Sequence, residues 1–331
     1  MKPSGTLFLQ RREVAALLDF DVYVKRVEDA FRAHAQGRSF APGLMHIDAQ
    51  GGEFHIKAGG LCDGQPRFGI KINGGFFENR VKFDMPNIQG VILLSDATNG
   101  YPLCVMDSME VTLQRTGAAT AVATRYLARH DSSVCVLCGL GNQGRIQLKA
   151  VVRTLSIRKV YAWSPFPGEP EAFARRMSAE LSVPIEPAGD LTGAASRADV
   201  IVTCTPAKKA FLMAGTVRPG TFIAAVGADS PDKQELEPAL VGSSKVVGDL
   251  IDQIVRVGDT HHAIEAGFLA REDIYAEIGE IIAGCKPGRT STEEIIVYDS
   301  TGTALQDTVA ASAIYEAACR AGVGTMIDLA A

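Results

Sequence analysis

The chain has 331 residues, which is long enough for two domains that each bury a hydrophobic core. Hydrophobic residues make up 47% and charged residues 21%, and the formal net charge of -5 without any basic run argues against a nucleic-acid-binding surface. No apolar stretch approaches the ~20 residues of a membrane span, and the N-terminus lacks the apolar core of a signal peptide. We therefore expect a cytoplasmic protein that binds neither nucleic acid nor membrane.

The cysteines are dispersed along the chain, which is typical of reduced thiols and not of a disulfide framework. Cys135 and Cys138 form a C-x-x-C pattern. In a strand, side chains three positions apart point to opposite faces, so these two thiols cannot hold one metal ion together. We expect both to pack in the core.

The first part of the chain predicts a helix pair followed by a sheet. Residues 13–37 are predicted as two helical pieces separated by D-F-D, with Asp21 as the N-cap of the second. Alternating segments between residues 44 and 106 predict an antiparallel sheet with one exposed face, and T-N-G-Y-P indicates a hairpin within it. Residues 108–129 predict a long alanine-rich helix.

From residue 133 the chain alternates strands and helices, which predicts a doubly wound parallel sheet. Strands are expected at K-V-Y-A-W-S, V-P-I-E-P, A-D-V-I-V-T-C-T-P, T-F-I-A-A-V-G-A-D, S-K-V-V-G-D and E-E-I-I-V-Y-D. The last helix, beginning T-A-L-Q-D, is expected to return to the N-terminal domain. The predicted fold class is thus α/β, with a Rossmann-type domain at residues 126–302 inserted into an α+β domain at residues 1–125 and 303–331.

A glycine pattern follows the first strand of this parallel sheet. The apolar run from Val134 to Leu140 is typical of a strand buried on both faces. Gly139, Gly141 and Gly144 then form G-x-G-x-x-G at the start of a helix. The first glycine permits the tight turn, the second lets the backbone approach a pyrophosphate, and the third lets helix and strand pack closely. The pattern predicts dinucleotide binding at the helix N-terminus.

Three other strand ends carry polar residues where a dinucleotide would lie. Ser164 follows the second strand, at the position where an acidic residue often binds the adenosine ribose, so the preference between NAD and NADP stays open. Thr203 and Thr205, in T-C-T-P, are small and polar enough to lie along the cofactor. Asp229 follows the fifth strand near the expected nicotinamide position, where a carboxylate could hold an ammonium group or act as general acid/base. A turn or N-cap aspartate is the alternative interpretation.

Candidate substrate-binding cations precede the glycine loop. Lys57 and Lys71 each lie inside an apolar strand, which fits either an exposed strand face or a cationic pocket for a substrate carboxylate. A partly desolvated lysine also titrates near neutrality, so we assign Lys71 a catalytic role as well. Arg115 stands where its helix becomes small and apolar, and its guanidinium matches a carboxylate in a bidentate manner. It is the first choice for anchoring an amino or imino acid.

The adjacent histidines His261 and His262 invite a metal-site interpretation because His261 and Glu265 are four residues apart on a predicted helix. The sequence offers no third ligand nearby. We therefore expect a solvated helix face there and predict no metal site in the chain.

Five motifs together make the sequence resemble the ornithine cyclodeaminase/mu-crystallin family over nearly the whole chain. They are F-G-I-K-I-N, L-Q-R-T-G-A-A-T-A-V-A-T-R-Y-L-A-R, G-L-G-N-Q-G-R-I-Q, G-A-D-S-P-D-K-Q-E-L and D-S-T-G-T-A-L-Q-D. The R-T-G-A-A and G-A-D-x-P-x-K-x-E-L stretches are far more specific than the glycine loop. The resemblance implies a homodimer, NAD(P) as cofactor and a small amino or imino acid as substrate.

The resemblance also implies roles for individual residues. Lys71 and Arg115 would contact the substrate carboxylate, and Asp229 would be the catalytic acid/base facing the substrate nitrogen. Residues implied to line the cofactor are Thr116, Asn142, Gln143, Ser164, Thr203, Val226 and Thr301.

The sequence departs from the family pattern at positions that bind the substrate carboxylate in other members. Many members carry an arginine around positions 42–46, where this chain has Leu44 and Met45, and a methionine-proline pair where it has Lys57. These changes in the carboxylate-binding residues argue against ornithine as the substrate. The chain also shares H-H-A-I-E-A-G with cyclodeaminase-like members associated with ectoine breakdown.

Three functions remain open on this basis. The first is NAD(P)-dependent reduction of an imino acid, or the reverse oxidation of an amino acid, in which hydride moves between the nicotinamide and the α-carbon. The second is cyclodeamination of ornithine to proline and ammonia, without net redox change, or a related step of ectoine breakdown. The third is a mu-crystallin-like protein that keeps the cofactor but turns over little.

Overall fold

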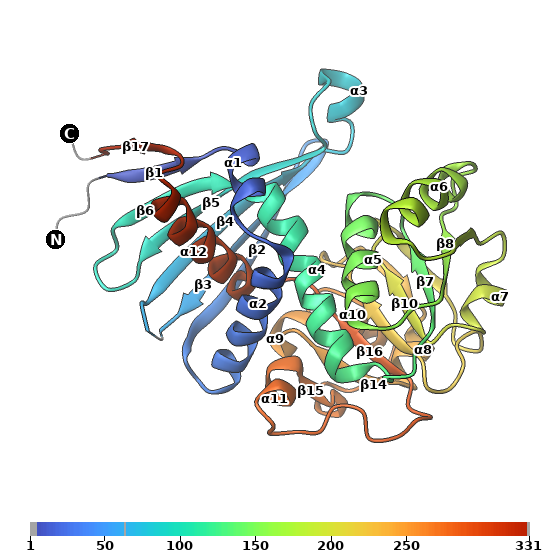
Figure 1. Cartoon of the computed structure of the whole chain (residues 1–331). Helices are drawn as coiled ribbons and strands as arrows, with labels where there is room; N and C mark the ends of the chain where they lie inside the picture. The colour runs from blue at the N-terminus through green and yellow to red at the C-terminus, as the bar shows by residue number, and fades with distance from the viewer. Residues whose placement is uncertain (1–4, 63, 330–331) are drawn as a thin grey trace. The chain divides into compact units, whose positions relative to one another are not determined.

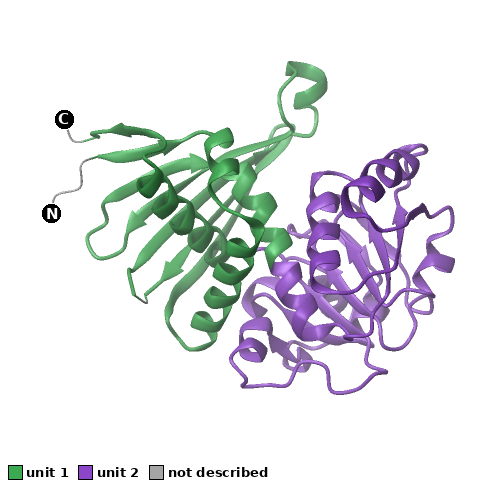
Figure 2. Cartoon of the chain, in the orientation of Figure 1, with its two compact units in different colours: residues 1–118, 303–331 green, residues 119–302 purple. Residues whose placement is uncertain are grey.

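The structure is a computed structural model that describes residues 5–62 and 64–329. The chain forms two compact units, which are described separately below (Figure 2). Unit 1 comprises residues 1–118 and 303–331, and unit 2 comprises residues 119–302. Unit 2 is therefore an insertion in the sequence of unit 1, and its first boundary falls inside the long helix α4 (Ser108–Leu127).

Unit 1 is built on a seven-stranded sheet of order β17-β1-β6-β5-β4-β3-β2. Neighbouring strands are antiparallel except for β1 and β6, so the predicted antiparallel sheet and its T-N-G-Y-P hairpin are confirmed. The strand β1 and the edge strand β17 carry little alternation and were not predicted. The strands are β1 Thr6–Leu9, β2 Ser39–Ala49, β3 Gly52–Leu61, β4 Arg67–Gly75, β5 Ile88–Asp96, β6 Pro102–Asp107 and β17 Thr325–Ile327.

Helices cover one face of this sheet. The last helix, α12 (Ala304–Ala321), packs on β3 and β4 and against α2 (Phe20–Ala35), so its predicted return to the N-terminal part is confirmed (Figure 1). The two-piece helix prediction is also confirmed, with α1 at Arg11–Leu17. The N-cap prediction was wrong. Asp19 is the extended residue before α2, whereas Asp21 lies in the first turn, where a carboxylate favours the helix dipole.

The opposite face of the sheet exposes apolar side chains. In the strand register, Met45, Ile56, Ile72 and Val91 form one row across β2 to β5. Met45 is 54% exposed, Ile72 42% and Val91 45%. Side chains alternate between the two faces of a strand, so this row points away from the face that carries Lys57 and Lys71.

Unit 2 is built on an eight-stranded, entirely parallel sheet of order β15-β14-β16-β12-β10-β7-β8-β9, which confirms the predicted doubly wound Rossmann-type sheet. The central strands are buried along their whole length. The strands are β7 Val134–Cys138, β8 Lys159–Trp163, β9 Ile185–Pro187, β10 Val200–Thr203, β12 Phe222–Ala225, β14 Lys245–Gly248, β15 Ala276–Glu277 and β16 Ile296–Asp299, and a small second sheet pairs β11 Lys208–Leu212 with β13 Gln234–Leu236.

The helices of unit 2 pack around this sheet. They are α5 Asn142–Thr154, α6 Glu169–Leu181, α7 Leu191–Ala195, α8 Pro238–Gly242, α9 Ile251–Ile254, α10 Asp259–Glu265, the 3-10 helix η1 Arg271–Asp273 and α11 Ile278–Ile282. Unit 1 has one further short helix, α3 Asn79–Phe83. Cys135 and Cys138 are fully buried in β7, and burial raises the pKa of Cys135 to about 12. Their predicted core role is confirmed. Among residues 5–62 and 64–329, the structure contains no helix both long and apolar enough to cross a bilayer.

Candidate active site

The predicted cofactor residues of unit 2 lie along one edge of the parallel sheet. The strands β8, β7, β10, β12 and β16 are consecutive neighbours in the sheet, and because they are parallel their carboxyl ends share one edge. The chain runs from β7 outward to β9 and then crosses to β10 on the other side of β7. This reversal is a topological switch point, where open α/β sheets bind ligands. The residues at or shortly after these strand ends are Gly139, Ser164, Thr203, Thr205, Val226, Asp229 and Thr301.

The glycine loop has the geometry that a dinucleotide requires. Gly139 has a φ of +102°, and a Cβ there would lie 2.7 Å from the carbonyl oxygen of Cys204. A Cβ on Gly144 would clash with the carbonyl oxygen of Gly139, so helix α5 can pack this close only with glycine. At Gly141, the N-cap of α5, no described atom lies within 4 Å of the position a Cβ would take. The loop therefore leaves open space beside the N–H groups of the first turn, which includes Asn142 and Gln143.

The end of β8 carries an acidic group that the sequence pattern did not suggest. The Oγ of Ser164 donates a hydrogen bond of 2.7 Å to Oε2 of Glu169, the first residue of α6. Glu169 stands five residues after Ser164, beyond the strand end where an acid is usually sought. A carboxylate here can accept from ribose hydroxyls, and it repels a 2′-phosphate.

Behind the loops after β10 and β12 lies a buried group of carboxylates. Glu235 accepts hydrogen bonds from the backbone N–H groups of Thr205 and Gly227, at 2.6 and 2.8 Å. Asp259 accepts from the N–H groups of Glu235 and Leu236, both at 2.8 Å. Burial, together with the charge of Asp259, raises the pKa of Glu235. This group holds the T-C-T-P loop and the loop that leads to Asp229 in fixed positions.

Asp229 is paired with a lysine from the same loop. Its Oδ1 lies 2.7 Å from Nζ of Lys233, whose side chain is only 13% exposed against 39% for Asp229. Lys233 is therefore a partly buried partner of Asp229. This ion pair fixes the orientation of the carboxylate.

Thr301 is held inside unit 2. Its hydroxyl donates to Oδ1 of Asp249 at 3.0 Å and accepts from Nε2 of Gln253 at 2.8 Å, and the residue is 2% exposed. Val226 donates its N–H to the carbonyl oxygen of Thr203. Both contacts fix the backbone of the strand ends, and a cofactor role for these residues stays a prediction.

In unit 1, the predicted substrate cations surround one buried carboxylate. Nζ of Lys71 lies 2.7 Å from Oδ2 of Asp307, and Nε of Arg115 lies 2.9 Å from Oδ1 of the same residue. Arg115 also donates from Nη1 to Oε1 of Gln306 at 2.8 Å. Lys57 stands directly opposite Lys71 across β3 and β4. We call Lys57, Lys71, Arg115 and Asp307 the cation cluster.

The cation cluster is almost completely shielded from water. Lys57 is 4% exposed, Lys71 2%, Arg115 5% and Asp307 2%, so the exposed-face interpretation of the two lysines was wrong. Their strand positions face α12, whose first turn supplies Asp307. Burial, the charge of Arg115 and that of Lys57 lower the pKa of Lys71 to about 7 despite its pair with Asp307. Burial alone would raise the pKa of Asp307, but Arg115 and Lys71 hold it below its usual value.

Lys71 and Arg115, two cationic side chains, share the single carboxylate of Asp307. A buried excess of positive charge is costly unless an anion joins it. The arrangement can therefore bind a small carboxylate, with Arg115 offering a planar pair of donors and Lys71 a compact charge. Thr116 lies on the same helix as Arg115 and donates its hydroxyl to the carbonyl oxygen of Thr112 at 2.6 Å.

Sequence reasoning missed Asp307, Gln306 and Glu169. The signal for Asp307 was present, because L-Q-D places a carboxylate in the first turn of an otherwise apolar helix. No local pattern, however, indicates that this carboxylate meets Lys71, which is more than two hundred positions away in the sequence. Glu169 lies in the first turn of α6, where an acidic residue is common and does not by itself indicate a ligand.

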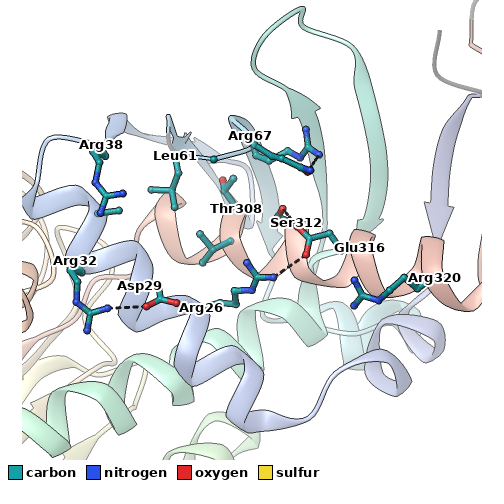
Figure 3. A pocket seen from close by; sticks show the side chains of 14 residues that line it. Arg26, Asp29, Arg32, Arg38, Leu61, Arg67, Thr308, Ser312, Glu316 and Arg320 are labelled. Atoms are coloured by element: carbon teal, nitrogen blue, oxygen red, sulfur yellow. Dashed lines mark hydrogen bonds and ion pairs between the residues drawn. The ribbon is translucent and has the colours of Figure 1, made fainter. Parts of the chain in front are cut away.

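Unit 1 also has a separate hollow of about 760 Å³ between α2, α12 and the β3–β4 turn (Figure 3). Five arginines line it, but acids within it pair with two of them. Arg26 meets Glu316 and Arg32 meets Asp29, each at 2.9 Å. The lining does not include Lys71, Arg115 or Asp307. We therefore place the candidate substrate site at the cation cluster and not in this hollow.

Comparison with known proteins agrees with this geometry. The alanine dehydrogenase of Archaeoglobus fulgidus is 36% identical over 323 residues, which cover 97% of this chain and 98% of that one. Among solved structures, an archaeal alanine dehydrogenase dimer with bound NAD matches with a TM-score of 0.93 at 35% identity, covering 98% of this chain and 99% of that one. The Δ1-pyrroline-2-carboxylate reductase of Thermococcus litoralis, in complex with NADH and L-proline, matches with a TM-score of 0.92 at 32% identity, covering 97% and 100%.

The family model described as ornithine cyclodeaminase/mu-crystallin matches residues 4–322. This span includes the glycine loop, Asp229 and every member of the cation cluster. The match and the relatives agree with the motifs quoted from the sequence, and the chain belongs to the ornithine cyclodeaminase/mu-crystallin family.

Proposed function

We propose that the chain is an NAD-dependent oxidoreductase that interconverts a small α-imino acid and the corresponding amino acid. The observation that carries the proposal is the buried cation cluster, in which Lys71 and Arg115 converge on Asp307. An excess of buried cations fits a substrate whose carboxylate completes the charge balance. Relatives that act on alanine and on pyrroline-2-carboxylate support the same class of substrate.

In the proposed mechanism the bound cofactor supplies the hydride chemistry, and three side chains act on the substrate. When bound at the glycine loop, the nicotinamide supplies or accepts the hydride exchanged with the α-carbon. Arg115 and Lys71 hold the substrate carboxylate and fix the position of the α-carbon next to it. Asp229 holds the substrate nitrogen. In reduction its carboxyl group gives the imine nitrogen one proton for the hydride that the carbon receives and is reprotonated from solvent, and in oxidation the carboxylate takes that proton back. Lys233, 2.7 Å from Asp229, holds that carboxylate in position.

NAD is the preferred cofactor in this proposal because of the pair formed by Ser164 and Glu169. A carboxylate at this strand end accepts hydrogen bonds from the adenosine ribose and repels a 2′-phosphate. Relatives whose structures contain NAD or NADH agree with this preference. We expect NADH to support turnover better than NADPH by on the order of tenfold or more, about 1.4 kcal/mol.

The proposed assembly is a homodimer formed through the exposed face of the unit 1 sheet. The row of Met45, Ile56, Ile72 and Val91 is apolar, and such a surface is typical of a protein–protein interface. A related alanine dehydrogenase is a dimer. We expect Ile72→Glu to produce monomers in analytical ultracentrifugation, because it places a charge in the centre of this row. Val81→Glu, at a residue 90% exposed on α3, is the matched control and should leave the dimer intact.

The direct test is an assay of NADH and NADPH oxidation with pyrroline-2-carboxylate and with pyruvate plus ammonia. We expect net NADH consumption with at least one of them. Ornithine converted to proline with no net change in nicotinamide absorbance would instead identify a cyclodeaminase. Cofactor binding without turnover of any of these would contradict the proposal and favour a binding role.

The residue test is Asp229→Asn, which keeps the shape of the side chain but removes its charge. We expect NADH binding, measured by fluorescence titration, to be unchanged and kcat to fall about 10²- to 10⁴-fold. Asp232→Asn, three residues further along the same loop, is the control. A variant at Asp229 with normal kcat would remove this residue from the mechanism.

A further inference from the structure

Two histidines and a carboxylate meet on the β2–β3 hairpin of unit 1. His46 and His55 are directly opposed across the two antiparallel strands. Their rings are nearly perpendicular, with centroids 4.7 Å apart. Glu53 lies two residues before His55 and therefore on the same face of the sheet. We call His46, Glu53 and His55 the hairpin cluster.

The ligand atoms of the hairpin cluster face one another. Nε2 of His55 lies 3.1 Å from Oε1 of Glu53, and Nε2 of His46 lies 3.6 Å from Oε2 of the same carboxylate. One ligand atom from each of the three residues lies within 4.8 Å of the others. Two donors on a tetrahedral zinc ion, with bonds of about 2.0 Å, are separated by about 3.3 Å. The cluster already has nearly the dimensions of such a coordination shell.

The register of the hairpin adds a second carboxylate. Asp48 stands directly opposite Glu53, one step along the same face from His46. Its Oδ1 is 3.1 Å from Nε2 of His46. Like charges directly opposed across two strands are destabilising unless a cation lies between them. Two imidazoles and two carboxylates on one hairpin face are thus arranged as metal ligands commonly are.

The low exposure of the hairpin cluster favours a metal site over an ordinary solvated surface. The side chains of His46, His55 and Glu53 are only 24%, 12% and 17% exposed, whereas Asp48 is 94% exposed. Partly desolvated imidazoles and a carboxylate gain more from an ion than exposed groups do. Asp48, or a water molecule, can supply the remaining ligand from the solvent side.

We propose that the hairpin cluster binds a divalent transition-metal ion of the zinc class, through the imidazoles of His46 and His55 and the carboxylate of Glu53. Imidazole selects zinc, nickel, copper or iron over calcium and magnesium, which prefer oxygen ligands. The bound ion cross-links β2 and β3 and stabilises the hairpin. This site departs from the expectation that the chain holds no metal, and it does not depend on the proposed function.

The other histidine group is a poorer site. His261, His262 and Glu265 also bring ligand atoms within 4.8 Å of one another on α10. Nε2 of His262, however, is 2.9 Å from the carbonyl oxygen of Lys233, and Glu265 is 65% exposed. These residues therefore serve as the internal control for the proposal.

The experiment uses the full chain after chelator treatment and dialysis. Zn²⁺ is titrated in competition with a chromophoric chelator, and Co²⁺ is titrated while its visible absorption is recorded. We expect one tight site, and a higher temperature of unfolding once Zn²⁺ is added. The double variant His46→Ala/His55→Ala should lose this site, with affinity lowered by more than about 100-fold, since even outer-shell changes cost 10- to 100-fold.

Two further variants keep the result interpretable. Glu53→Gln retains the size of the side chain, so it should fold while it weakens the site and alters the Co²⁺ spectrum. The double variant His261→Ala/His262→Ala should bind as the wild type does. The proposal is overturned if the wild type binds no more Zn²⁺ than the His46/His55 variant, or if the tight site disappears only in the His261/His262 variant.

Discussion

Both units bury several ionisable groups, and they do so in opposite ways. In unit 1, Lys71 and Arg115 both pair with Asp307 and lower the pKa of that carboxylate, while burial lowers the pKa of Lys71 to about 7. In unit 2, Glu235, Asp259 and Asp299 lie together, and burial raises the pKa of each. The first group has an excess of positive charge, and the second has an excess of acids.

The two buried groups differ in what satisfies their charges, and this difference distinguishes a ligand-binding group from one that holds loops in place. Backbone N–H groups of Thr205, Gly227 and Leu236 donate to the acids of unit 2, so those acids hold loops in place. In the cation cluster, side chains do the pairing, and a small anion can join them. A buried group of charges thus indicates a ligand site when its charges fail to balance and when side chains, not backbone, satisfy them.

The largest expected effect comes from the cation cluster. Arg115→Ala removes the planar donor pair and leaves Asp307 with fewer cations, so we expect kcat/KM to fall about 10³-fold, near 4 kcal/mol. Arg125→Ala, at an exposed arginine of the same helix, is the matched control and should change kcat/KM by less than about twofold. Normal kinetics for Arg115→Ala would refute the carboxylate anchor and with it the contrast between the two groups.

A smaller effect is expected from the titration of Lys71. Its pKa of about 7 means that the ammonium form is lost as the pH rises above neutrality. Affinity for the substrate carboxylate should therefore fall by about tenfold per pH unit above that value. The measurement is the inhibition constant of an unreactive carboxylate from about pH 6 to about pH 9, where its own charge is constant.

Lys71→Arg provides the control for this titration. A guanidinium stays charged throughout this range, so the loss of affinity above neutrality should disappear even if the affinity itself is lower. A wild-type profile that is flat, or one that is identical in the arginine variant, would show that another group titrates.

The sequence predicted the sheets of both units and the cations of the cation cluster, but neither the carboxylate of that cluster nor the buried acids of unit 2. Alternation predicted the antiparallel sheet, and the apolar strands predicted the parallel one, because each pattern is local. Lys71 and Arg115 stood out because a charge within an apolar run is visible in the sequence. Asp307 did not, since its importance arises only when α12 packs on β4, and the same holds for His46 and His55, which meet only through the register of their hairpin.

The last expected effect concerns the stability of unit 2. Burial, with Asp259 and Asp249 nearby, raises the pKa of Asp299 well above its ordinary value of 3.8. A raised pKa in the folded state contributes stability that is fully present below the unfolded value and is lost as the pH rises through the folded one. The free energy of unfolding should therefore fall with rising pH above about 4, by about 1.4 kcal/mol per pH unit for this group.

Asp299→Asn should flatten that dependence, because an amide resembles the protonated acid and does not titrate. The measurement is urea unfolding at a series of pH values, with Asp252→Asn, at an exposed carboxylate with 81% side-chain exposure, as the control. If the Asn variant loses stability with rising pH as steeply as the wild type, Asp299 is ionised in the folded chain. The acids of unit 2 would then carry unbalanced charge, as the cation cluster does, and the distinction between a binding group and a supporting group would rest on their hydrogen-bond partners alone.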